Sequence, residues 1–159
     1  MTTETALDPA RLRVRHKQWG WWLLFVSLLL GMALDILHGL KLGWYLDVSS
    51  QTRRLMWTLA HAHGTLVALV HLAFASAAGE LAPRARGLAS KSLIAAGVLL
   101  PGGFLLGGVY TYSGDPGVGA LAAPIGGVLL IVAVGLTARA MAQPEAPKIP
   151  AEATEPRSP

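Results

Sequence analysis

Five ionisable side chains lie inside long apolar stretches of this chain. They are one acid and four histidines, namely Asp35, His38, His61, His63 and His71. A charged group in a hydrocarbon span costs about 2.5–3.5 kcal/mol on insertion scales, so such residues usually face a bundle interior and often mark function. If the chain carries chemistry, we expect it at these residues.

Carboxylate and imidazole ligands together suit several divalent ions. Asp35, His38 and His61 are therefore a candidate metal-binding set. His38 and His61 could also supply axial imidazoles to haem b from two facing helices. His63 points about 200° away from His61 on a regular helix, and His71 lies about 15 Å further along it. The candidate cofactor ligands are His38, His61, His63 and His71. No cofactor is preferred, and metal or haem b is the alternative to a role without a cofactor.

The expected depths of these residues motivate the metal hypothesis. His38 comes eight residues before the end of the first apolar span, and His61 follows Arg54 by seven residues at the start of the second. In a hairpin of two helices both would reach a similar depth, and Asp35, one turn deeper, could accept a hydrogen bond from either.

Three uses of the polar residues remain open. They are hydrogen bonds between helices, proton or ion handling, and metal or haem binding. Structural hydrogen bonding is favoured because polar groups commonly join helices in lipid. The chain has no cysteine and no nucleophile elbow, phosphate loop or dinucleotide fingerprint. An enzyme is therefore the least expected class.

Composition indicates a small polytopic membrane protein. Of 159 residues, 53% are hydrophobic and only 14% are charged, which is too apolar for an ordinary soluble domain. The formal charge of +4 comes from basic residues that stand between apolar spans, so no nucleic-acid partner is expected. The expected partner is the lipid bilayer, with a homo-oligomer or a larger membrane complex as further possibilities.

Four spans exceed the roughly 20 residues that cross a bilayer, and short connections between them predict antiparallel neighbours. The last connection reads Ser-Gly-Asp-Pro-Gly, a turn signal. Pro101, followed by two glycines, predicts a break or kink in the third span. We therefore expect an all-α, antiparallel bundle of four transmembrane helices, whose spans are about 19–46, 55–78, 88–112 and 118–141.

The charges divide the chain into parts and orient it. We expect a basic segment at 1–17, a membrane domain at 18–142 and a disordered proline-rich tail at 143–159. An excess of basic residues marks the cytoplasmic side, which puts both termini in the cytoplasm, most simply at a bacterial inner (plasma) membrane. Nine basic residues fall on that side and three on the other: Arg11, Arg13, Arg15, Lys17, Arg84, Arg86, Lys91, Arg139 and Lys148 against Lys41, Arg53 and Arg54.

Short motifs in a fixed order give a family resemblance. They are His38-Gly39-Leu40-Lys41, Trp57-x-x-x-His61-Ala62, Gly107-Gly108-Val109-Tyr110 and Pro124-Ile125-Gly126-Gly127. Over about residues 25–140 this order resembles the YgdD-type small membrane proteins, a family of unknown function that includes transmembrane protein 256. The resemblance implies a four-helix integral membrane protein. Trp57, Gly108 and Ala123 depart from it, since the family tends to have tyrosine, serine and threonine there.

Two function hypotheses follow. The first is a structural or accessory membrane protein whose buried histidines are packing features. The alternative is a small transporter or a metal- or haem-binding membrane protein that uses Asp35, His38 and His61.

Overall fold

The protein is all-helical over the residues that its structure describes. The computed structural model describes residues 8–46 and 51–142, and within them no β-strand forms, apart from one isolated bridge between Tyr112 and Asp115. The all-α prediction is confirmed, whereas the predicted disorder of 143–159 falls outside the described residues. The elements are α2 (Pro9–Gly39), α3 (Gly43–Leu46), α4 (Gln51–Ala77), α5 (Pro83–Val109), the 3-10 helix η2 (Val118–Leu121) and α6 (Ala122–Met141).

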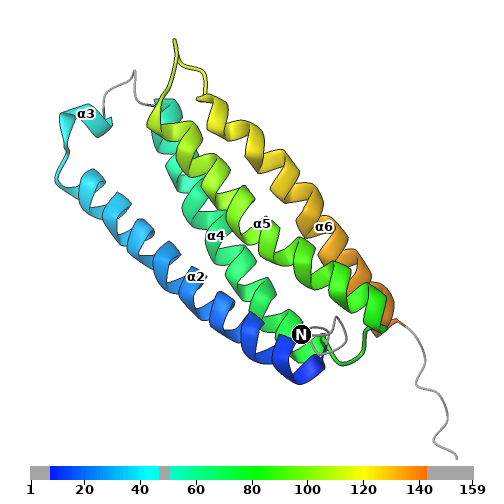
Figure 1. Cartoon of the computed structure of the whole chain (residues 1–159). Helices are drawn as coiled ribbons and strands as arrows, with labels where there is room; N and C mark the ends of the chain where they lie inside the picture. Colours follow the sequence, from blue (N-terminus) through cyan, green and yellow to red (C-terminus); the bar gives the residue numbers. More distant parts are fainter. Residues whose placement is uncertain (1–7, 47–50, 143–159) are drawn as a thin grey trace, which may run out of the picture.

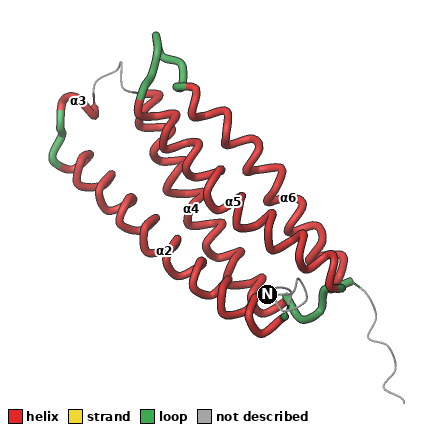
Figure 2. Tube along the Cα trace, viewed as in Figure 1, coloured by secondary structure: helices red, strands yellow, loops and turns green. Residues whose placement is uncertain are grey.

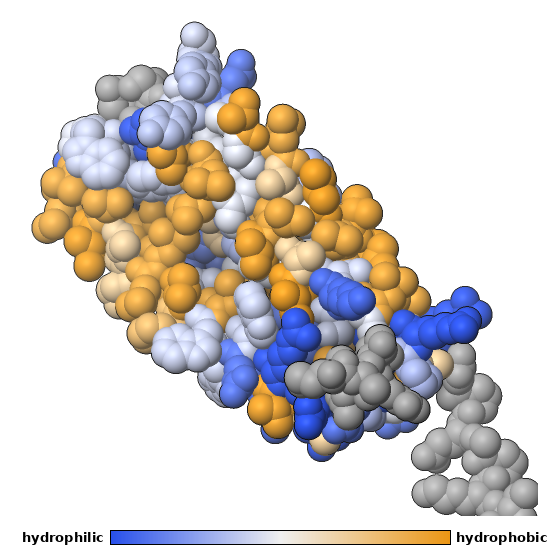
Figure 3. Space-filling view, in the orientation of Figure 1, coloured by the Kyte–Doolittle hydropathy of each residue, from blue (hydrophilic) through white to orange (hydrophobic). Residues whose placement is uncertain are grey.

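Four of these helical segments are long and apolar enough to cross a membrane. They are Pro9–Gly39, Gln51–Ala77, Pro83–Val109 and Val118–Met141, in agreement with the four predicted spans. Figure 3 shows hydrophobic side chains over the middle of one face and hydrophilic side chains gathered toward its two ends. This distribution is what a bilayer requires of a spanning bundle.

The long helices lie side by side in the order α2, α4, α5, α6 (Figures 1 and 2). The extensive contacts are those of α2 with α4, of α4 with α5, and of α5 with α6. The start of α2 lies beside the end of α4, because His16 contacts His71. α2 begins and α6 ends at the same end of the molecule (Figure 1). The α4–α5 pair therefore forms the centre, with α2 and α6 on its two sides.

Helix α2 begins and ends earlier than the first apolar span. Asp8 caps its start by accepting a hydrogen bond from the backbone N–H of Ala10, 3.1 Å away, and Pro9 occupies the first turn, where proline is favoured. The helix ends at Gly39, because Lys41 adopts a left-handed φ of 50°, and α3 follows as a separate turn. The predicted boundary at residue 17 thus falls within α2, and the predicted end at residue 46 falls at the end of α3.

Side chains of the first turn of α4 hold the neighbouring loops. Thr52 donates a hydrogen bond to the Gly114 carbonyl, Arg53 donates to the carbonyl of Gly108 at 3.1 Å, and Arg54 donates to the carbonyl of Tyr45 at 3.1 Å. Carbonyls at helix C-termini lack intrahelical donors, so the two arginines satisfy groups that lipid could not. The predicted turn is confirmed, with Ser113 and Gly114 at positive φ.

Trp57 joins α3, α4 and α5 at the end of the bundle where α4 begins. Its indole Nε1 donates to the Leu105 carbonyl at 3.2 Å, and its ring stacks on Tyr45 with centroids 6.5 Å apart. An ideal Cβ on Gly108 would lie only 2.6 Å from the indole. The missing side chain of Gly108 therefore provides the space that the large indole occupies.

Helices α5 and α6 approach each other through glycine. An ideal Cβ on Gly126 would lie 2.5 Å from the backbone nitrogen of Leu100, and one on Gly103 would lie 2.5 Å from that of Ala123. Close backbone approach of this kind drives helix association in lipid. Gly127 meets nothing within 4 Å, so it lies off the contact. α5 remains helical through Pro101, so the helix is not broken there, and the alternative of a kink stays a prediction.

Gly126→Ala should destabilise the bundle, because its Cβ would meet backbone atoms that cannot move aside. We expect a loss of about 1–3 kcal/mol in the free energy of unfolding in detergent, as for other overpacked sites. The neighbouring Gly127→Ala is the matched control. It should be neutral or stabilising by up to about 1 kcal/mol, since alanine favours helix more than glycine does. Equal effects of the two variants would contradict the close approach.

Candidate functional site

The most deeply buried polar groups form one cluster across three helices. His16 of α2 and His71 of α4 are each 0% exposed, and Ser90 of α5 is 2% exposed. Nδ1 of His16 lies 2.7 Å from Nδ1 of His71, and Nε2 of His16 lies 2.9 Å from Oγ of Ser90. We call these three residues the histidine cluster. It joins α2, α4 and α5 near the end of the bundle where α2 begins.

The bond between the two rings restricts their protonation. An N···N hydrogen bond needs one ring to donate and the other to accept, so both rings cannot carry two protons at once. Nε2 of His71 has no partner at hydrogen-bonding geometry, although the backbone of Leu93 still interacts favourably with this ring. One series of hydrogen bonds satisfies most of these groups. In it the Ser90 hydroxyl donates to His16 Nε2, and His16 Nδ1–H donates to Nδ1 of His71.

The surroundings of the cluster leave it closed. Phe74 places its edge against the His16 ring, with centroids 4.6 Å apart, and Trp19 stacks on His71 at 6.1 Å. An ideal Cβ on Gly97 would lie 3.1 Å from Nε2 of His71. A metal ion bound about 2.0–2.1 Å from that nitrogen would meet the backbone of α5. The cluster is therefore arranged to join helices, with no space for a ligand at this nitrogen.

The predicted metal set is not brought together. Asp35 and His38 are exposed on α2, while the ring of His61 lies over Gly31, whose ideal Cβ would be 2.5 Å from Cε1 of His61. Asp35 is thus one turn beyond the level of His61. His38 is seven residues beyond Gly31, which is about 10 Å along the axis. The described residues contain no group of three or more His, Cys, Asp or Glu side chains that could hold a metal ion.

The error in depth has a physical cause. The expectation measured His38 from a helix end at residue 46, whereas α2 ends at Gly39. The expected and the observed helix ends differ by seven residues. His38 is displaced along the helix axis from the level of His61 by the same number of residues.

His61 and His63 each have one nitrogen fixed by a backbone carbonyl. Nδ1 of His61 lies 2.7 Å from the Ser27 carbonyl oxygen, and Nδ1 of His63 lies 2.9 Å from that of Leu59. A carbonyl only accepts, so each Nδ1 carries the hydrogen and the neutral ring keeps a lone pair on Nε2. Metal-binding histidines use this arrangement. The His63 ring also packs on Phe104, with centroids 4.9 Å apart.

His16 is the functional candidate that sequence reasoning missed. It stands among basic residues and was assigned to a polar segment ahead of the first span. A signal was nevertheless present, because small, polar and apolar residues recur at intervals of four or seven positions, which is one or two helical turns, and form the buried face of the helix. The buried residues of α2 are Leu12, His16, Gly20, Ser27 and Leu34.

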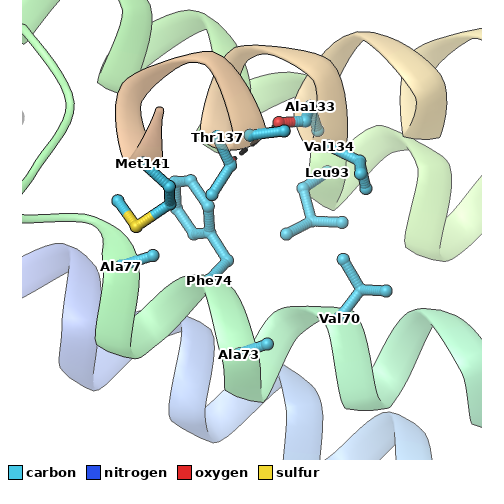
Figure 4. A pocket seen from close by; sticks show the side chains of 10 residues that line it. Val70, Ala73, Phe74, Ala77, Leu93, Ala133, Val134, Thr137 and Met141 are labelled. Atoms are coloured by element: carbon cyan, nitrogen blue, oxygen red, sulfur yellow. Dashed lines mark hydrogen bonds between the residues drawn. The ribbon is translucent and has the colours of Figure 1, made fainter. Parts of the chain in front are cut away.

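A groove of about 310 Å³ lies between α4, α5 and α6 (Figure 4). Its lining is almost entirely apolar, and its one hydroxyl, that of Thr137, donates to the carbonyl of Ala133 at 2.9 Å. Phe74, which lines the groove, also contacts His16 of the cluster. The groove therefore has no free polar group for chemistry. Its lining residues are Val70, Ala73, Phe74, Ala77, Leu93, Ala133, Val134, Thr137, Ala138 and Met141.

Four apolar helices, three of them joined by a closed polar cluster, are compatible with a small polytopic membrane protein, and this is the class that the fold and the site indicate. No family model, curated protein or solved structure matches the chain. The resemblance to the YgdD-type family therefore stays a prediction.

A double-mutant cycle tests the histidine cluster. His16→Leu and His71→Leu should each lower the free energy of unfolding in detergent by about 1–3 kcal/mol, because each leaves a buried partner unpaired. The double variant should lose less than the sum, since replacing both partners by apolar groups leaves neither unpaired. His63→Leu combined with His71→Leu is the control pair and should be additive within about 0.5 kcal/mol. Additivity of the cluster pair would show that the two rings do not act together.

Proposed function

We propose that this chain is a structural or accessory protein of a bacterial inner (plasma) membrane. In this proposal its four long helices form an antiparallel transmembrane bundle with both termini in the cytoplasm. The observation that carries the proposal is the histidine cluster, in which His16, His71 and Ser90 join three helices.

The closure of the cluster supports a structural role over transport or catalysis. A substrate or ion pathway needs access to its polar groups, yet His16 and His71 are 0% exposed. The aromatic rings and the α5 backbone fill the space around them. In lipid, polar groups that bond between helices stabilise helix association by about 0.6–2 kcal/mol each. Such a cluster holds the bundle in one arrangement.

The distribution of charge supports the proposed orientation. The start of α2, the α4–α5 connection and the end of α6 lie at one end of the molecule (Figure 1), and these segments carry most of the basic residues. Excess lysine and arginine mark the cytoplasmic side. At the other end, Arg53 and Arg54 bond to backbone carbonyls. The order of motifs further supports a proposed kinship with the YgdD-type family.

One observation favours a second candidate, a metal- or haem b-binding membrane protein. His61 and His63 both keep Nδ1–H on a carbonyl, as ligating histidines do. Nε2 of His61, however, lies 3.1 Å from the ideal Cβ of Gly31, as close as Nε2 of His71 lies to that of Gly97, so the observation favours His63. The two rings leave α4 in different directions, since they are two residues apart. Each would therefore need further ligands from elsewhere, and Asp35 and His38 are not placed beside His61.

Reporter fusions test the orientation. A fusion after Met141 should report a cytoplasmic location, and an insertion between residues 47 and 54 should report an external one, because the basic excess lies at the end that holds the start of α2. The two fusions use the same reporter in the same protein, so each serves as the control for the other. The reverse pattern would reject the proposed topology.

Absorption and metal analysis separate the two candidates. Protein purified in detergent without chelator should be colourless and should hold no stoichiometric metal if the histidines are structural. The second candidate instead requires a Soret band or near-stoichiometric metal that His61→Ala or His63→Ala removes, because loss of one ligand removes most of a site's affinity. His38→Ala serves as an exposed control. A cofactor lost only with His61 or His63 would overturn the structural role.

A further inference from the structure

Exposed basic side chains gather in the first turns of α2. None of them forms a hydrogen bond or an ion pair with a residue that the structure describes. By contrast, Arg53 and Arg86 donate hydrogen bonds to backbone carbonyls. The start of α2 therefore presents positive charge without a paired counter-charge from the described chain. The basic residues are Arg11, Arg13, Arg15 and Lys17.

A shallow groove runs along α2 beside these charges. It consists of three adjoining hollows that all include Gln18, and one of them has a volume of about 550 Å³. Together they extend from Ala10 to Phe25, which is about 22 Å along the helix axis. We call this surface the α2 groove. Its residues on one side of the helix, in order along the axis, are Arg11, Arg15, Gln18, Trp22 and Phe25.

The order of these side chains matches the parts of one phospholipid. The guanidinium groups of Arg11 and Arg15 suit a phosphate, which arginine binds through paired, charge-assisted hydrogen bonds. The Gln18 amide, one turn further along, is a donor for an ester carbonyl. Trp22 is an amphipathic ring of the kind that gathers at the headgroup level. Phe25 then offers apolar surface to an acyl chain.

The groove also has the length of one membrane leaflet. α2 contains 31 residues and is therefore about 46 Å long. A bilayer with its headgroup regions is roughly 40–45 Å thick, so the first half of α2 lies in a single leaflet. The groove occupies this half and is about as long as the leaflet is thick. The headgroup and an acyl chain of one lipid therefore fit along it from end to end.

We propose that the α2 groove binds one anionic phospholipid, with its phosphate at Arg11 and Arg15 and one acyl chain along Trp22 and Phe25. Clusters of basic residues at the cytoplasmic end of a transmembrane helix attract anionic lipids. The groove adds a defined position to this attraction, because it includes Arg15 but not Arg13, which points about 200° away from Arg15. The inference goes beyond the proposed structural role and rests on the proposed placement of α2 in the membrane.

Tryptophan quenching in vesicles tests whether the headgroup charge is recognised. The full chain is placed in phosphatidylcholine vesicles that contain an equal small fraction of brominated phosphatidylglycerol or brominated phosphatidylcholine, with the same composition in both leaflets. Bromine on the acyl chain quenches tryptophans that it contacts. We expect phosphatidylglycerol to quench more strongly, because Arg11 and Arg15 hold it beside Trp22. Equal quenching by the two lipids would overturn the proposal. Quenching by neither would also reject the placement of α2 in the bilayer, whatever the orientation of the chain.

Two matched arginine variants separate the groove from general attraction to a charged surface. Arg15→Gln should weaken the preference for phosphatidylglycerol about fivefold, the effect of one basic residue at an anionic surface. Arg13→Gln removes the same charge from the other side of the helix, where salt screens it from the groove, and should change the preference less than about twofold. Both side chains are exposed and unbonded, so circular dichroism should show equal helix content. Equal losses of preference in the two variants would reject the groove.

Discussion

The hydrogen bond between His16 and His71 fixes how α2 lies on α4, and much of the structure depends on that register. The bond is 2.7 Å long between two fully buried rings, so water does not reach the two rings to replace it. Once it forms, Gly20 lies against Leu72, Ser27 against Gly64 and Gly31 against His61. Sliding α2 by one turn would leave both rings unpaired and would drive side chains into these close contacts.

The two sides of the bundle are held by different physics. Between α2 and α4 two glycines receive polar side chains, the Ser27 hydroxyl at Gly64 and the His61 ring at Gly31, whereas Gly20 receives Leu72. Between α5 and α6 the glycines bring the two backbones together, as Gly126 does at Leu100. Packing of the second kind depends on shape alone, because lipid gives apolar helices no hydrophobic reason to associate. The polar contacts between α2 and α4 therefore determine their register, and the apolar contacts between α5 and α6 provide close packing.

Hydropathy was sufficient to predict the spanning segments but not their registers. The four spans and the turn at 113–117 follow from composition and from turn residues, which act locally. On α4, Gly64, Ala68 and His71 recur at helical spacing and are all buried, so the helical period marks this part of the buried face. The end of α2 was not predictable in the same way. Residues 40–46 contain a single charged residue, Lys41, and extend the apolar pattern of the span. The break there depends on the left-handed backbone of Lys41, which hydropathy does not register. Because of that one break, His38 lies seven residues from its expected level, and the expected metal ligands are not brought together. His16 was missed for a different reason, because it stands among charged residues although it belongs to the buried face of α2.

The contact between Trp57 and Gly108 links two positions that look independent in the sequence. The structure places the two in direct contact, with the indole in the volume that a Cβ at Gly108 would fill. The same indole donates its N–H to the carbonyl of Leu105, so it is fixed against α5 by a hydrogen bond as well as by shape. Any side chain at position 108 would therefore have to move α5 away from α4 or break this hydrogen bond, and the identities of residues 57 and 108 constrain each other.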